Sequence, residues 1–387
     1  MTFSTMSAVY RITEAGLNPL QLILVGTVLE LTVLLADVPT GVLADVYSRR
    51  LSMIVGYVLI GVGYILEGSL PIFASILVAQ VVWGFGFTFV SGAFQAWLSD
   101  ELKDDSKTAA VFVKATKYES FGALAGIGLS AALATVYVGF SLIAGGVIFI
   151  GLGLFVAASM TETGFTPSSN RERRTWDSMT NVLKTGLRAV SMSRVLMALV
   201  AIEIFFGMSS EPFDRLWAKH TLEMFDFPAI FGLDPIVWFG VIQAVAAIAA
   251  IVGISVMERL VPVDRPWAPR LALSLFNVTM IGATLTFALT GTFGIAITMV
   301  VVVYVLHRVT WPFAAAWINR NCESEYRATV FSLHEQANSF GQVFFGPGMG
   351  LLATLRGLRA ALVGVSILLI PPQLLYLVRE PSAGGEQ

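Results

Sequence analysis

Hydrophobic residues come in runs of helical length along this chain of 387 residues, separated by short polar breaks. A helix needs about 20 consecutive apolar residues to cross the hydrocarbon core of a bilayer. We predict eleven such spans: residues 20–43, 51–66, 71–98, 116–136, 139–160, 195–217, 235–257, 268–289, 293–318, 329–352 and 358–377. The runs lack the alternating pattern of a membrane β-barrel. The pattern therefore predicts an all-α membrane protein that crosses the bilayer many times.

The longest polar break, residues 161–194, divides five predicted spans from six. A basic stretch at residues 171–174 is followed by apolar side chains at helical spacing: Trp176, Met179, Leu183, Leu187 and Val190. We predict an amphipathic helix lying on the membrane surface, with a plain linker as the alternative. The resulting domains are an N-terminal helical bundle (1–160), a cytoplasmic linker (161–194) and a C-terminal helical bundle (195–387).

Composition strengthens this interpretation and excludes other classes. Hydrophobic residues make up 56% of the chain and charged residues 13%, against about 25% charged in soluble proteins. The net charge of −2 argues against a nucleic-acid partner, which requires a basic surface. High hydrophobicity excludes intrinsic disorder. The single cysteine, Cys322, excludes an intrachain disulfide and a cysteine-rich metal site.

The distribution of Lys and Arg predicts the orientation of the chain in the membrane. If the loop at residues 45–50 faces the cytoplasm, 18 of the 24 basic residues lie on that side, five lie on the other, and Arg308 lies inside a span. Cytoplasmic loops carry such an excess of basic residues. We therefore expect the C-terminus in the cytoplasm.

The two halves of the chain share short segments at a nearly constant separation of 219 or 220 residues. The matches are Ala96-Trp97 with Ala316-Trp317, Val111-Phe112 with Val330-Phe331, and Ser120-Phe121-Gly122 with Ser339-Phe340-Gly341. Such repeats indicate a duplicated helical unit, as in many transporters. Because the second half has six predicted spans, we expect six in the first half, which shows five and a short N-terminal stretch.

One loop resembles the signature of a known family. The segment Gly41-Val-Leu-Ala-Asp45-Val-Tyr-Ser-Arg49-Arg50 resembles the G-x-L-a-D-r-x-G-r-k loop of the major facilitator superfamily, and departs from it at Val46 and Ser48. The preceding Asp-Val-Pro-Thr-Gly resembles the lead-in of bacterial efflux-type members. The resemblance implies two pseudo-symmetric six-helix bundles, alternating access, and a secondary transporter of the plasma (inner) membrane that acts as a monomer.

The same resemblance implies a gating cluster built from Gly41, Asp45, Arg49, Arg50 and Asp100. Small residues such as Gly41 let membrane helices approach closely. Asp45 is expected to accept hydrogen bonds from the start of the penultimate helix, and Arg49 to pair with Asp100. This cluster would latch the two bundles in the outward-facing state. For Arg50 we favour a simple topology anchor, which is also the alternative for the whole cluster.

The predicted fifth helix of the family pattern carries Gly122, Gly126 and Gly128. This spacing suits close helix packing and is similar to the family's antiporter motif, although the proline of that motif is absent. We therefore favour export of a small amphipathic molecule in exchange for protons. Proton-coupled uptake of a metabolite and a degraded, non-transporting membrane protein are the alternatives.

Ionisable side chains inside spans are costly, so each is a candidate for function. We predict proton-coupling or substrate-binding roles for Glu30, Glu203, Arg308 and Glu335, with structural hydrogen bonding as the alternative. We expect His334 to be a satisfied polar contact. Another polar group, including Glu211, Asp214 and Arg215, surrounds the outer end of the span at residues 195–217.

Several signatures of other chemistry are absent from the sequence. No Gly-Lys dipeptide occurs, so the phosphate-binding P-loop is missing, and neither H-E-x-x-H nor G-x-S-x-G is present. We therefore expect no enzymatic activity, no cofactor and no metal. The expected partners are a small-molecule substrate, protons and the lipid bilayer.

The N-terminus departs from the family pattern. Residues 11–19 resemble the short outer loop that follows the first helix, which leaves residues 1–10 as only its outer half. We expect that the coding sequence begins upstream of Met1, or that the gene is truncated.

Overall fold

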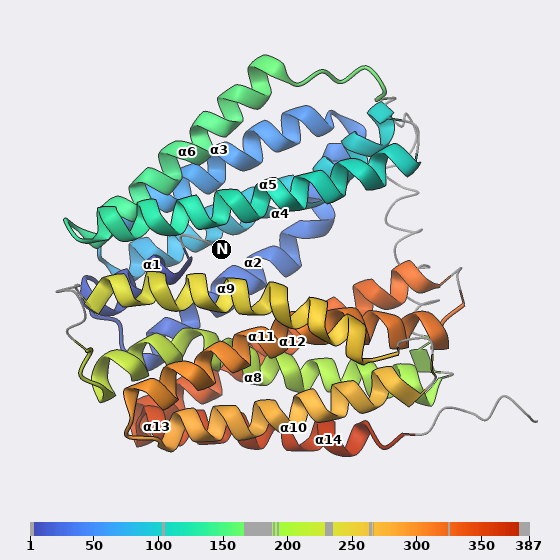
Figure 1. The fold of residues 1–387 in the computed structure, drawn as a ribbon. Coiled ribbons are helices and arrows are strands. Elements are labelled where there is room, and N and C mark those ends of the chain that lie inside the picture. The colour runs from blue at the N-terminus through green and yellow to red at the C-terminus, as the bar shows by residue number, and fades with distance from the viewer. Residues whose placement is uncertain are drawn as a thin grey trace, which may run out of the picture. The chain divides into compact units, whose positions relative to one another are not determined.

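The computed structural model describes residues 4–102, 105–165, 188, 190–191, 193–228, 235–262, 265, 267–323 and 326–378, and every regular element in these ranges is a helix (Figure 1). The order is α1 (Ser4–Thr13), α2 (Pro19–Val46), α3 (Arg49–Ser69), α4 (Phe73–Leu102), α5 (Asp105–Ala134), α6 (Val138–Ser159), α8 (Arg194–Met224), α9 (Pro235–Leu260), α10 (Trp267–Leu289), α11 (Phe293–Asn321), α12 (Arg327–Arg356), α13 (Leu358–Leu368) and α14 (Ile370–Leu375).

The chain divides into two compact units. The first comprises Met1–Trp176 with Phe227–Ala244, and the second comprises Asp177–Asp226 with Val245–Gln387. Most of the predicted amphipathic helix of the linker lies outside the described residues; Arg188, Val190 and Ser191 are described, and all three are helical.

The membrane environment favours helices, because hydrocarbon offers no hydrogen-bond partner for an unpaired backbone N–H or C=O group. Local signals set their ends. At the start of α2, the Gln21 backbone N–H donates to Asn18 Oδ1 (2.9 Å) and the Asn18 N–H donates to Gln21 Oε1 (3.0 Å), which forms a capping box. Threonine hydroxyls within α2 form hydrogen bonds to the preceding turn of the helix; for example, the hydroxyl of Thr32 donates to the carbonyl of Val28 (2.7 Å).

Nine of the helices in the described residues are long and apolar enough to span a bilayer, against eleven spans predicted. The two that differ are α5 and α12, each of 30 residues. Their length suffices, but charged and polar residues interrupt the apolar stretch, which in α5 is reduced to Phe121–Ala134. Mean hydropathy alone therefore underestimates the number of membrane spans, because it misses long helices that carry polar side chains.

Close helix contacts depend on glycines, but not on all of those expected. In the first unit α3 and α6 run side by side (Figure 1), and a Cβ atom on Gly61 would lie 2.6 Å from the carbonyl oxygen of Gly146. By contrast, a Cβ atom on Gly122 or Gly128 would meet open space. Among the described residues, the structure shows no close packing through these two α5 glycines, and both positions are exposed.

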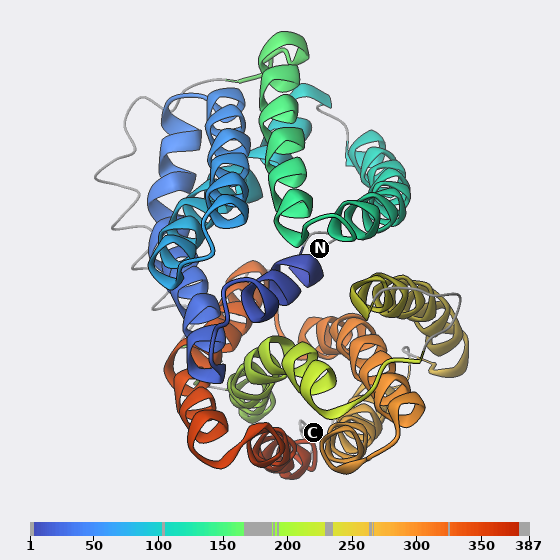
Figure 2. The same ribbon diagram turned by 90° about the vertical axis from the view of Figure 1, so that its left-hand side faces the viewer.

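The second unit has an aromatic core. Trp317 of α11 is fully buried, and Phe313 of the same helix packs edge-on against Phe276 of α10, with ring centroids 5.4 Å apart. These two helices lie side by side (Figure 2). Trp317 also stacks on Tyr376, which follows α14. This packing joins the last helix to the core of its unit.

A buried ion pair joins α1 to α3 in the first unit. The guanidinium of Arg11 donates to both carboxylate oxygens of Glu67 at 2.7 and 3.0 Å, and Gln80 of α4 donates to the same carboxylate at 2.7 Å. The two charged side chains are only 7% and 3% exposed. Arg11 thus lies in a helix rather than in the predicted outer loop, because its charge is neutralised inside the bundle.

We predict that Arg11→Met destabilises the protein strongly, by roughly 3–5 kcal/mol, because it leaves the Glu67 carboxylate buried and unpaired. The double variant Arg11→Met/Glu67→Gln removes that charge and keeps an acceptor for Gln80, so most of the stability returns. Thermal unfolding in detergent checks both variants. An unchanged unfolding temperature for Arg11→Met would show that the pair contributes nothing.

Candidate functional site

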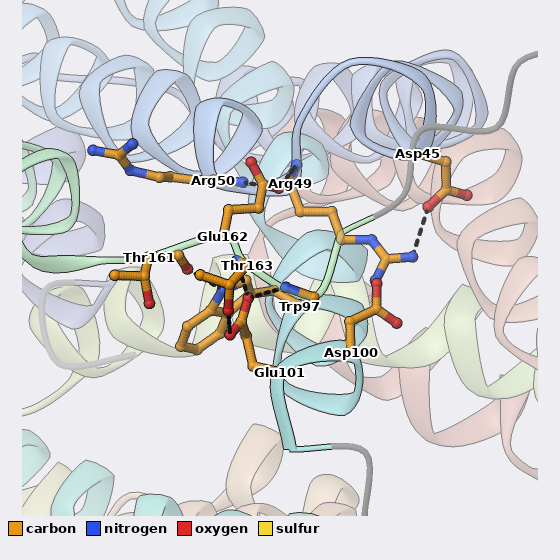
Figure 3. Close-up of polar contacts among 10 residues, drawn as sticks. Asp45, Arg49, Arg50, Trp97, Asp100, Glu101, Thr161, Glu162 and Thr163 are labelled. Carbon is orange, nitrogen blue, oxygen red and sulfur yellow. Dashed lines mark hydrogen bonds and ion pairs between the residues drawn. The ribbon is translucent and has the colours of Figure 1, made fainter.

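Charged side chains gather at the end of the first unit where α2 ends, α3 begins and α4 ends (Figure 3). Arg49 is the centre of this cluster. Its guanidinium donates to Asp45 Oδ1 at 3.3 Å and also forms an ion pair with Asp100. The Arg49 side chain is 16% exposed, against 51% for Asp45 and 36% for Asp100. The structure therefore brings together three of the four charged residues of the expected gating cluster.

Local sequence explains this arrangement. Helix α2 ends at Val46, and Ser48 caps α3 by accepting a hydrogen bond from the backbone N–H of Leu51 (3.0 Å). The tight connection places Arg49 in the first turn of α3, one residue after the cap. Asp100 lies in the last turn of α4, so three helix ends contribute one charged side chain each.

Arg50 takes a different direction from Arg49 (Figure 3). Its guanidinium donates to the carbonyl oxygen of Ala157 in α6, and its backbone N–H donates to Glu162 Oε1 at 3.2 Å. Arg50 thus belongs to the contact between α3 and the end of α6, apart from the Asp45–Arg49–Asp100 group.

Among the described residues, nothing lies within 4 Å of where a Cβ atom on Gly41 would stand. Gly41 borders a hollow of about 230 Å³ between α2 and α4, lined also by Asp37, Ala44, Asp45, Thr88, Gly92, Ala93 and Ala96. The close helix approach expected at Gly41 stays a prediction, whereas Ala44 is buried in a small cluster with Met53 and Ala93.

The second unit has a matching hollow of about 210 Å³ between α9 and α11, lined by Ile254, Glu258, Val309, Pro312, Phe313 and Ala316. The α11 residues Pro312, Phe313 and Ala316 stand 220 positions after Gly92, Ala93 and Ala96 of the first hollow. The internal repeat thus has a structural counterpart, and an acidic side chain lines each hollow.

A second polar cluster joins α8 to α12. Glu203 Oε2 lies 3.2 Å from His334 Nε2, and the side-chain amide of Asn338 donates to Glu203 Oε1 at 2.6 Å. Gln342, one turn further along α12, donates to Asn338 Oδ1. The side chains of Glu203 and His334 are 17% and 3% exposed. The cluster is therefore a nearly enclosed polar group between two membrane helices.

Two glycines allow the close crossing that forms this cluster. A Cβ atom on Gly207 of α8 would collide with the backbone oxygen of Asn338, and one on Gly341 of α12 would collide with the backbone oxygen of Ile204. Small residues at such crossings are what brings polar side chains of membrane helices within hydrogen-bonding distance.

The remaining predicted residues are dispersed. Glu335 is exposed on α12 but close enough to Glu203 for Coulombic repulsion. Arg308 is exposed on α11 and interacts electrostatically with Asp214 of α8, which lies about three helical turns beyond Glu203. Glu30 is half-buried on α2, in the first unit. Within the second unit, Glu335 therefore lies near Glu203, whereas Arg308 is a neighbour of Asp214; a joint role of the four residues stays a prediction.

Sequence reasoning missed Asn338 because a neutral amide in a span, unlike a charged side chain, is not a strong indicator of function. Its spacing of four residues from His334 was the available signal. It also missed the buried Arg11–Glu67 pair, whose members flank predicted spans. Within the described residues, no group of three or more His, Cys, Asp and Glu side chains is placed to hold a metal ion.

Comparisons with known proteins agree with this architecture. The family model described as Major Facilitator Superfamily matches residues 1–308. An uncharacterized MFS-type transporter of Bacillus subtilis (strain 168), YxaM, is 21% identical over 361 residues, which cover 93% of this chain and 87% of YxaM.

Solved structures show the same fold at low identity. A mutant of the nucleoside transporter NupG superposes with a TM-score of 0.79 at 11% identity, covering 97% of this chain and 94% of that chain. A POT family transporter in complex with 5-aminolevulinic acid gives 0.74 at 15% identity, and a bacterial homolog of the human lysosomal transporter Spinster gives 0.71 at 14%; each covers 97% of this chain and 93% of its own.

We predict that Gly341→Ala and Gly348→Ala change stability in opposite directions. A methyl group at Gly341 forces α8 and α12 apart, costing roughly 1–3 kcal/mol, whereas one at Gly348 meets open space and gains helix propensity. Thermal unfolding in detergent measures both. Equal effects of the two substitutions would contradict the close crossing at Gly341.

Proposed function

The chain belongs to the major facilitator superfamily, and on that basis we propose that it exports a small amphipathic molecule in exchange for protons. It is a multi-pass membrane transporter of the alternating-access type rather than an enzyme. The nucleoside, peptide and Spinster-type structures share its fold at 15% identity or less, so their substrates are not transferred to this chain.

The Glu203 cluster is the observation that carries the proposal. A carboxyl group enclosed between membrane helices binds or releases a proton according to the water and charge that reach it. Glu203 has hydrogen-bond partners on α12 and a second carboxyl, Glu335, nearby. Movement of α12 against α8 would change all of these contacts together. Protonation of Glu203 would thereby be coupled to the conformation of the helix pair.

His334 supports the same role. Its Nε2 faces Glu203, while its Nδ1 is buried with no hydrogen-bond partner in the described part of the chain. A buried polar atom without a partner is costly and often marks a functional position. We assign Glu203 the coupling role, with Glu335 as its electrostatic neighbour. Glu30 and Arg308 are assigned to substrate binding.

The direction of transport rests on sequence features. Pro39, Thr40 and Gly41 follow Asp37 as in efflux-type members, and α5 carries the glycine-rich run. The missing proline of the antiporter motif favours the alternative, proton-coupled uptake, and the direction of substrate movement distinguishes the two.

For gating, we assign Asp45, Arg49 and Asp100 to a latch that closes the cytoplasmic side, with Gly41 beside it and Arg50 as an anchor. Asp45 would accept hydrogen bonds from the start of α12 near Arg327. We further propose that the C-terminus lies in the cytoplasm and that the protein acts as a monomer in the plasma membrane. The proposed bundles are residues 1–160 and 195–387, joined by residues 161–194.

We predict that Glu203→Gln abolishes proton-driven transport while leaving the fold intact, because glutamine keeps the hydrogen bond to Asn338 but cannot exchange a proton. Proton-driven transport is measured as accumulation of the probe ethidium in everted membrane vesicles with an imposed pH gradient. Glu223→Gln, an exposed residue at the end of the same helix, is the matched control. Undiminished ethidium accumulation in Glu203→Gln would remove Glu203 from the coupling step.

Asp45→Asn tests the latch. We expect the maximal transport rate to fall by about tenfold or more, with normal membrane insertion, because Arg49 loses one of its two carboxylate partners. Initial rates of ethidium transport and the amount of protein in the membrane are the measurements. The charge-exchanged double variant Arg49→Asp/Asp100→Arg should recover part of the rate lost in Arg49→Asp. Wild-type rates in Asp45→Asn would leave the cluster as a topology anchor only.

A further inference from the structure

A five-residue segment that begins two positions after the end of α6 is hydrogen-bonded to the ends of α3 and α4. We call this segment, residues 161–165, the linker root, because it begins the connection between the two halves of the chain. It contacts the same helix ends that carry Arg49 and Asp100, and Figure 3 shows both groups together. None of the gating assignments above uses these contacts.

Glu162 holds the start of α3. Its carboxylate accepts hydrogen bonds from the hydroxyl of Ser48 (2.6 Å) and from the backbone N–H groups of Arg49 (2.7 Å) and Arg50 (3.2 Å). These N–H groups have no partner within the helix, and a negative charge is favourable at a helix N-terminus. Glu162 therefore acts as a second cap for α3, supplied from 113 residues away.

Glu101 holds the linker root to the end of α4. Its Oε1 accepts hydrogen bonds from the backbone N–H groups of Thr163 (2.5 Å) and Gly164 (2.8 Å), and its Oε2 accepts one from the Thr163 hydroxyl (2.7 Å). One turn earlier on α4, the indole of Trp97 donates to the carbonyl of Thr161 (2.8 Å). Hydrogen bonds to an ionised carboxylate are the stronger kind, so the attachment is firm.

The linker root also packs closely against the end of α4 and against Arg49. A Cβ atom on Gly164 would collide with the backbone oxygen of Asp100, so only glycine permits this approach. The next residue, Phe165, places its ring 5.7 Å from the guanidinium carbon of Arg49, within cation–π range. The linker root thus contacts Asp100 through its backbone and Arg49 through an aromatic ring.

An exposed ion pair does not by itself hold a long side chain in one orientation, and Asp45 and Asp100 are both partly exposed. We propose that Glu101 and Glu162 are positioning residues of the gate, which hold the linker root as a strut between α3 and α4 so that Arg49 spans Asp45 and Asp100. The linker between the two halves is thereby attached directly to the gate.

This inference rests on the proposed latch, so its test must separate the two. Gly92 lines the hollow beside Asp45, is exposed, and has room for a side chain. Gly92→Cys in a Cys322→Ser background is labelled with a membrane-impermeant maleimide in vesicles that expose the cytoplasmic side. The labelling rate reports how often the hollow is open, with no substrate required.

We expect Glu162→Ala, Glu101→Ala and Gly164→Ala each to raise the labelling rate by about threefold or more, as Asp45→Asn does. Gly164→Ala is the key variant, because it changes no charge and removes no hydrogen-bonding side chain. Glu14→Ala, exposed after α1, and Gly151→Ala, which meets open space on α6, are the matched controls and should leave the rate unchanged.

A double-mutant comparison separates positioning from general damage. If the strut acts through Arg49, Glu162→Ala combined with Asp100→Asn is no more open than the more open of the two single variants, whereas independent effects multiply. Thermal unfolding in detergent identifies a variant that merely fails to fold, and the Gly164→Ala result then decides.

Unchanged labelling in Gly164→Ala and Glu162→Ala, while Asp45→Asn opens the hollow, would overturn the strut and leave the latch intact. Unchanged labelling in Asp45→Asn would overturn the latch. Multiplicative effects in the double variant would also overturn the strut.

Discussion

The structure depends on one constraint: a polar group buried in a membrane bundle has little water to bond with, so leaving it without a partner in the protein is costly. Helices satisfy the backbone, and threonine hydroxyls bond to the preceding turn. The charged side chains require partners on other helices. Arg11 finds Glu67, Glu203 finds Asn338 and His334, and Arg49 finds Asp45 and Asp100. Each such pair fixes how two helices meet.

These pairs differ in exposure, and exposure indicates what each can do. Arg11 and Glu67 are almost wholly enclosed and neutralise one another, which suits a permanent joint between helices. Glu203 is enclosed and bound to an amide and an imidazole, neither of which carries a permanent charge, so its own charge depends on its surroundings. The carboxylates around Arg49 are partly open to solvent, which suits a contact that breaks and forms again. A transporter of alternating access needs all three kinds, because some contacts must persist while others change.

Much of the fold was predictable because apolar runs of helical length have one interpretation in a bilayer, and the family loop identified Asp45 and Arg49. The rest depended on three-dimensional detail. Glu67 lay just past a predicted span, so its burial was hidden. Glu162 caps a helix that begins more than a hundred residues earlier in the chain, and no local sequence pattern predicts such a contact. The spacing of Gly122 and Gly128 suggested close packing, but spacing alone does not say which face of α5 meets a neighbour. Asp214 proved to be an electrostatic neighbour of Arg308, and no spacing in the sequence indicates that proximity.

We propose that substrate movement and proton movement are coupled through the buried carboxyl group of Glu203. The most direct measurement uses purified protein in proteoliposomes that contain the pH-sensitive dye pyranine, with an ethidium gradient as the only driving force. The account predicts that the pH falls in the compartment that ethidium leaves, because protons move against the flow of ethidium. Ethidium transport with no change in pH would contradict proton coupling, and protons that accompany ethidium would contradict exchange.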